Sequence, residues 1–197
     1  MPETNEKIFE NHEFYEVNFR NLKLENNEFH NKIFENCYFS ESKFTNCQFI
    51  DCEFKSCNLS NTRFKNTSFV EIIFDECKLI GVNWTQAKWP IIKLNSPVQF
   101  YKCNISDSSF YELDLKEIVI EACVAHRVDF REDDFSNGNF TLTDFDGSLF
   151  LHTKLVSVDF TECINYGVDP NQNDIRKSIF STPDVLNLLN SFDITIQ

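Results

Sequence analysis

A repeat of five residues runs through most of the chain and restricts it to very few folds. Large apolar side chains recur at every fifth position from Phe9 to Leu94 and again, shifted by one residue, from Phe100 to Phe160. The two blocks hold 18 and 13 repeats, or 31 in all, and 20 of the 22 Phe occupy this central position. A period of five fits neither the α-helix nor the β-strand, so it predicts stacked repeat units.

A second position repeats in the same phase, two residues before each centre. It favours small or branched side chains, as in the segments NCQFI and DCEFK. A buried cysteine behaves as a small hydrophobic residue, so free, unreactive thiols are predicted rather than disulfides or metal ligands. We expect Cys37, Cys57 and Cys77 to stack on one face, and Cys103 to stack with Cys123. All eight cysteines occupy this inward position: Cys37, Cys47, Cys52, Cys57, Cys77, Cys103, Cys123 and Cys163.

These repeats resemble the pentapeptide-repeat family over about 155 of the 197 residues. The resemblance implies an all-β solenoid, a right-handed quadrilateral β-helix with four repeats per coil and about eight coils. At a spacing of ~4.8 Å per coil, the rod would be roughly 37 Å long. Residues 20 apart would then stack. One face is expected to carry Phe9, Phe29, Phe49, Phe69, Trp89, Phe110, Phe130 and Phe150, and the next Phe14, Phe34, Phe54, Phe74, Leu94, Leu115, Phe135 and Leu155.

The segment 84–100, WTQAKWPIIKLNSPVQF, is the main irregularity. Pro90 and Pro97 lack the backbone donor that a β-ladder needs, and Leu94 is followed by the next centre after six residues rather than five. We predict a one-residue bulge at 95–99, with a functional loop as the alternative. The chain is thus divided into a lead-in at 1–8, a β-helix at 9–163 and a capping and dimerisation segment at 164–197.

The C-terminal segment carries the signals of a short α-helix. Ser181 or Thr182 can cap its start, Pro183 suits the first turn, and Asp184 is favourable near the positive end of the helix dipole. A helix of under three turns is not stable alone, so its apolar stripe must cover the last coil, a second subunit, or both. The stripe consists of Val185, Leu186, Leu188, Leu189 and Phe192.

Negative charge dominates the second half of the repeats. The whole chain has 31 acidic and 18 basic residues and a net charge of −13, which argues against direct binding of nucleic acid and permits a basic partner. Between Asn104 and Glu162 there are 13 acids against four bases. Asp133 falls in the inward slot, where we expect partial burial against a backbone amide or an arginine. Two adjacent faces hold most of this charge imbalance, with Arg127 as their one base, and carry the candidate partner-binding residues: Asp107, Glu121, Asp144, Asp146, Asp159 and Glu162.

The sequence contains no motif that is typical of a catalytic, phosphate-binding or metal-binding site. We find no glycine-rich phosphate loop, no nucleophile with a matching base, no HExxH motif and no metal-ligand spacing, and the four histidines are scattered. We therefore expect no enzyme activity, no catalytic residue, no cofactor and no metal. The N-terminus lacks a signal peptide pattern and no stretch is long and apolar enough for a membrane helix, so a cytoplasmic protein is expected.

Within the family, the chain is similar to the quinolone-resistance (Qnr) and microcin-immunity branch. The similarity rests on the interrupted middle near LIGVNW and on the tail GVDPNQNDIRKSIFSTPDVLNLLNSF. It implies a homodimer joined at the C-terminal ends. It also implies an acidic rod that resembles duplex DNA, binds a type II topoisomerase such as DNA gyrase, and protects it from quinolones or toxins. Several members carry long projecting loops, whereas this chain shows only the one-residue insertion. The alternative is a structural or adaptor scaffold with a different protein partner.

Overall fold

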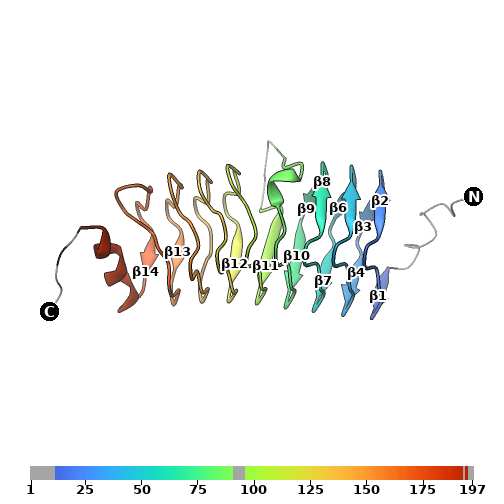
Figure 1. Ribbon diagram of the computed structural model, residues 1–197, viewed down its shortest axis with the longest axis horizontal. Coiled ribbons are helices and arrows are strands. Elements are labelled where there is room, and N and C mark those ends of the chain that lie inside the picture. Colours follow the sequence, from blue (N-terminus) through green and yellow to red (C-terminus); the bar gives the residue numbers. More distant parts are fainter. Residues whose placement is uncertain (1–11, 91–95, 193, 195–197) are drawn as a thin grey trace, which may run out of the picture.

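The computed structural model describes residues 12–90, 96–192 and 194. It is a parallel β-solenoid of about eight turns, which confirms the predicted fold class. Figure 1 shows the coils side by side along the long axis, with β1 near one end and the terminal helix at the other. The strands are β1 (Glu13–Tyr15), β2 (Lys23–Glu25), β3 (Glu28–His30), β4 (Ile33–Glu35), β5 (Lys43–Thr45), β6 (Gln48–Ile50), β7 (Glu53–Lys55), β8 (Arg63–Lys65), β9 (Ser68–Val70), β10 (Ile72–Asp75), β11 (Val98–Tyr101), β12 (Val119–Glu121), β13 (Asp159–Phe160) and β14 (Ile179–Phe180). The 3-10 helices among the described residues are η2 (Trp84–Gln86) and η3 (Asp184–Phe192).

Each strand pairs in parallel with its counterpart one coil further along the rod. Phe14 lies opposite Phe34, for example, and Phe34 opposite Phe54. One six-stranded sheet has the order β1-β4-β7-β10-β11-β12, and two three-stranded sheets have the orders β2-β5-β8 and β3-β6-β9. In the C-terminal half, single bridges such as Asp114 to Asp134 continue the same spacing. The repeat of four pentapeptides per coil is therefore confirmed.

The central residues of the repeats form the core as columns of stacked side chains. The rings of Phe14, Phe34, Phe54 and Phe74 stack with centroid distances of 5.0, 4.9 and 5.0 Å. All four are buried. Such pairs add about 0.5–1.5 kcal/mol beyond the area that they bury, so the columns stabilise the rod along its whole length.

The coil between β10 and β11 is longer than the sequence analysis predicted. Ile72 pairs with Val98, where the regular register would place position 92, so this coil contains six residues more than the regular twenty. Phe74 stacks on Phe100 and Trp84 on Phe110, and both pairs show the same enlarged offset. The expected one-residue bulge and the placement of Phe110 above Trp89 are therefore wrong. Leu94, expected above Phe74, lies outside the described residues.

The physical reason is that this coil contains one whole repeat and one further residue more than the regular coils. Trp89 keeps its contact with Phe69 at 5.8 Å, but no described residue of the next coil continues its column in register. Helix η2, drawn in green in Figure 1, lies in this coil, and its cap residue Asn83 accepts a hydrogen bond from the Thr85 amide at 3.0 Å. The regular register continues as far as Lys88, which is bridged to Ser68. Pro90 and Pro97, which lack a backbone donor, lie in the same coil.

The new register also places five of the cysteines in one column. Cys37, Cys57, Cys77, Cys103 and Cys123 follow one another directly, with the Cys37 amide donating to Cys57 Sγ at 3.4 Å and the Cys103 amide to Cys123 Sγ at 3.3 Å. All eight cysteines are buried with free thiols, which confirms their inward placement. Burial raises the pKa of the Cys163 thiol to about 12, so this group stays protonated and unreactive at neutral pH.

The four corners of each coil require left-handed backbone. The residue two positions after most centres has a positive φ, for example Asn36 at 52° and Leu142 at 61°. Asparagine and glycine tolerate this region best, and asparagine is frequent at the corners of the first half. In the second half, longer side chains occupy many corners and so contribute strain that the stacked coils hold in place.

Candidate functional site

Two adjacent faces of the C-terminal half carry the acidic residues that the sequence analysis selected. They meet at the corner column Ala122, Leu142 and Glu162, whose residues all have positive φ. Face 1 has two columns of residues: one is Asn104, Val124, Asp144 and Ile164, and the other is Ser106, His126 and Asp146. Face 2 also has two columns: one is Val119, Asn139 and Asp159, and the other is Glu121, Thr141 and Thr161.

All six candidates belong to this region. Asp144 and Asp146 lie on face 1, Glu121 and Asp159 on face 2, and Glu162 at the shared corner. The sixth, Asp107, occupies the opposite corner of face 1 and is exposed.

Two of these carboxylates accept hydrogen bonds from side chains of neighbouring coils. Asp107 accepts two hydrogen bonds from Arg127, at 2.8 and 2.9 Å, and this ion pair lowers the pKa of Asp107. Asp144 accepts from His126 Nε2 and from Asn165 Nδ2, both at 2.8 Å. Burial alone would raise the pKa of Asp144, but these hydrogen bonds hold it below its usual value. Both groups are therefore ionised at neutral pH. Asp107 nevertheless adds little to the negative potential of the surface, because Arg127 balances its charge.

The remaining four carboxylates differ in exposure. Asp146 and Glu162 are exposed. Glu121 and Asp159 are half-buried, with Glu121 accepting from Asn139 Nδ2 at 3.0 Å and Asp159 from the Thr161 amide at 2.8 Å. Asp146 and Glu162 are therefore the most accessible negative groups of the two faces.

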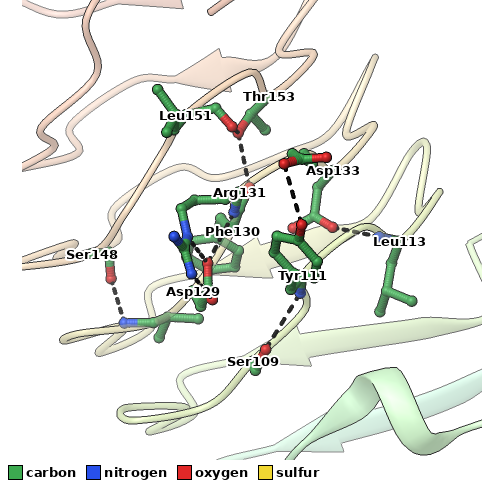
Figure 2. A network of polar contacts seen from close by, with 12 residues as sticks. Ser109, Tyr111, Leu113, Asp129, Phe130, Arg131, Asp133, Ser148, Leu151 and Thr153 are labelled. Carbon is green, nitrogen blue, oxygen red and sulfur yellow. Dashed lines mark hydrogen bonds and ion pairs between the residues drawn. The ribbon is translucent and has the colours of Figure 1, made fainter.

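On the neighbouring face, Asp129 is paired with an arginine. Arg131 forms a two-pronged ion pair with Asp129, at 2.8 and 2.9 Å, and its guanidinium lies 5.6 Å from the centre of the Tyr111 ring (Figure 2). The Tyr111 hydroxyl donates to Glu132 at 3.2 Å. Counting acids along the sequence could not show this pairing, which concentrates the unbalanced charge on faces 1 and 2.

Asp133 is buried more completely than expected. Its side chain is 1% exposed, and its Oδ1 accepts a hydrogen bond from the Leu113 amide at 2.7 Å (Figure 2). Its Oδ2 is buried with no hydrogen-bond partner among the described residues. Burial raises the pKa of Asp133 to about 9, so this carboxyl is neutral at pH 7. The backbone amide predicted as its partner is confirmed, whereas no arginine pairs with it in the described part of the chain.

The C-terminal helix divides the proposed dimerisation stripe into two sides. The helix is present, as a 3-10 rather than an α-helix. Leu188 is buried and Val185 packs against the core, while Leu189 is half-buried. Leu186 and Phe192 are 45% and 49% exposed. One side of the stripe therefore covers the last coil, next to the stacked rings of Phe160 and Phe180, and the other side faces outward.

The described residues offer little for other kinds of site. Within residues 12–90 and 96–192, no three or more His, Cys, Asp and Glu side chains are grouped so that they could hold a metal ion. None of the helices in this part of the chain combines the length and the apolar character that crossing a membrane requires.

Comparisons with known proteins agree with this architecture. Residues 27–97 match a family model described as a pentapeptide repeat region. No curated protein matched the sequence. Two solved structures of trypsin-treated QnrB1 variants, described as a plasmid-mediated fluoroquinolone resistance protein, are similar in fold. One has a TM-score of 0.66 at 17% identity, over 94% of this chain and 100% of that chain. The other has a TM-score of 0.62 at 19% identity, over 94% and 98%.

Proposed function

We propose that the chain is a pentapeptide-repeat protein and a non-enzymatic acidic rod that binds a type II topoisomerase, such as DNA gyrase, in place of duplex DNA. The fold shared with QnrB1, which is described as a fluoroquinolone resistance protein, supports a further role in protecting that enzyme from quinolones or toxins.

The observation that carries the proposal is the uneven charge of faces 1 and 2. Duplex DNA carries about one negative charge per 1.7 Å of its axis. A rod of roughly 37 Å with a net charge of −13 carries about one per 3 Å, roughly half that density. Because Asp146 and Glu162 are exposed and Asp144 is ionised, a basic groove shaped for DNA would meet charge of the right sign on these faces.

We propose that two copies of the rod form a homodimer through their C-terminal ends. A two-fold contact between two η3 helices would bury the exposed Leu186 and Phe192 of both subunits, because an isologous interface uses the same patch twice. The resulting rod would be roughly 75 Å long, at ~4.8 Å per coil.

A supercoiling assay with purified DNA gyrase tests the proposal. We expect the wild-type protein to bind the enzyme and to alter its activity, with and without a quinolone. Reversing Asp144, Asp146, Asp159 and Glu162 to Lys should abolish binding while the protein stays folded. The matched control reverses four exposed acids of the other half, Glu13, Glu16, Glu25 and Asp51, and should retain binding. Equal affinity of the wild type and the first variant would contradict DNA mimicry.

The dimer has a separate test. We expect light scattering at micromolar concentration to give twice the mass of one 23.2 kDa chain, and Leu186→Asp with Leu189→Asp to give a monomer. A wild-type mass near that of one chain would contradict the dimer.

A further inference from the structure

Three basic side chains are stacked on one face of the N-terminal half. The parallel register of β2, β5 and β8 places Lys23 opposite Lys43 and Lys43 opposite Arg63. All three are exposed, and successive coils lie ~4.8 Å apart. Like charges directly opposite each other destabilise a sheet. This cationic column therefore works against folding, in a chain whose net charge is −13.

Nothing in the described part of the chain neutralises the column. Lys55 pairs with Glu53 at 3.0 Å, and Arg127 pairs with Asp107, but no ion pair among the described residues involves Lys23, Lys43 or Arg63. The three positive charges thus remain available to a ligand.

The cationic column lines a polar groove of about 950 Å³. Glu41 is the single acid among its described lining residues, so the lining has a net charge of +2. Asparagine and glutamine amides supply further donors. At the corner, Gly81 has a φ of 71° and lies close to Asn61, because a Cβ there would lie 2.5 Å from Asn61 Oδ1. The groove is lined by Asn21, Lys23, Glu41, Lys43, Asn61, Thr62, Arg63, Gly81, Asn83 and Gln86.

We propose that this groove binds an extended acidic peptide segment of a partner protein. From Asn21 to Gly81 it crosses four coils, or three spacings of ~4.8 Å, which matches about four residues of extended peptide at ~3.4 Å each. Carboxylates on such a segment can form charge-assisted hydrogen bonds with the lysine and arginine side chains.

Nucleic acid fits the same groove less well. Three basic residues neutralise few phosphates, and the net charge of −13 repels a long polyanion beyond the immediate contact. In the following coils, Asn83 and Ser109 occupy the position equivalent to the cationic column. The corner that contains Gly81 and Asp107 separates this position from face 1. Its binding is therefore independent of the proposed topoisomerase contact.

The test is fluorescence anisotropy with a labelled peptide of eight glutamates at low salt, using the full-length protein. We expect saturable binding by the wild type, and Lys23→Glu with Lys43→Glu and Arg63→Glu should raise the Kd about tenfold or more. The matched control, Lys102→Glu with Lys154→Glu and Lys177→Glu, makes the same charge change at exposed residues elsewhere and should change the Kd less than about threefold.

Circular dichroism checks that both variants fold, and Gln in place of Glu at the three groove positions provides a milder variant that should also weaken binding. Three results overturn the proposal: no saturable binding by the wild type, an equal loss in the matched control, or tighter binding of a single-stranded oligonucleotide of the same charge. Each of these leaves the gyrase assay unaffected, so the two functions fail separately.

Discussion

Asp133→Asn should stabilise the protein at neutral pH, although it removes a charge from an acidic half. The same column shows how an amide fits the inward slot. Asn173 donates from Nδ2 to the Phe150 carbonyl at 3.1 Å and accepts from the Thr153 amide at 3.0 Å. Asp133 already makes the equivalent second bond, with the Leu113 amide. An asparagine at 133 would supply the missing donor to the equivalent carbonyl, that of Phe110.

The magnitude follows from the pKa of Asp133, which burial raises from 3.8 to about 9. The folded state therefore binds a proton that the unfolded state has released above pH 4. Stability from this group is fully present below pH 4 and is lost as the pH rises toward 9. At ~1.36 kcal/mol per pH unit, the loss at pH 7 is roughly 4 kcal/mol. The asparagine variant avoids this loss because its side chain does not ionise.

Urea denaturation of both proteins from pH 4 to pH 8 measures the difference. We expect nearly equal free energies of unfolding at pH 4 and a growing advantage of Asp133→Asn toward pH 8. Asp134→Asn is the matched control. The pKa of Asp134 is lowered, so its ionised form stabilises the fold above pH 4 and this variant should lose stability there. A difference between wild type and Asp133→Asn that does not change with pH would refute the reasoning.

Three further predictions follow from the core and the corners. Phe49→Ala should lower the free energy of unfolding by ~3–5 kcal/mol, because Phe49 is stacked between Phe29 and Phe69 at 4.5 and 5.8 Å; an unchanged denaturation midpoint would contradict the column. Leu142→Asn should raise it by about 1 kcal/mol, because an exposed leucine with a φ of 61° is strained; the same urea titration would show a loss if the corner were not strained. The eight thiols should react with a thiol reagent only after unfolding, and rapid labelling of the native protein would argue against their burial.

Periodicity predicts the fold of this chain well because each repeat carries its own core residue. Phe34, Phe54 and Phe74 could be assigned to the interior, and to one column, from their regular spacing alone. The register across 84–100 could not, because Trp89 and Leu94 keep the apolar pattern in the sequence although the coil contains six extra residues. Only Pro90 and Pro97 signalled that backbone donors are missing there.

The candidate site was predicted less completely, for a related reason. Charges at the same position of successive coils lie one above the other, so the pairing of Asp107 with Arg127 and the repulsive set Lys23, Lys43 and Arg63 are both visible once the register is known. Counting acids and bases along the chain detected the excess on faces 1 and 2 but missed the cationic column. The four-repeat spacing of these basic residues was the signal that could have identified it.

The enlarged coil lies between the two charged surfaces along the rod. In a solenoid each repeat contacts only its neighbours, so one coil can contain an additional whole repeat. A shift of one residue alone would turn the core residues outward. Here the two changes occur together, and the columns continue without a break from Phe74 to Phe100 at 5.3 Å. Helix η2 follows Asn83 in the enlarged coil, and Asn83 and Gln86 both line the cationic groove. The groove therefore ends at the enlarged coil, and faces 1 and 2 lie in the coils that follow it.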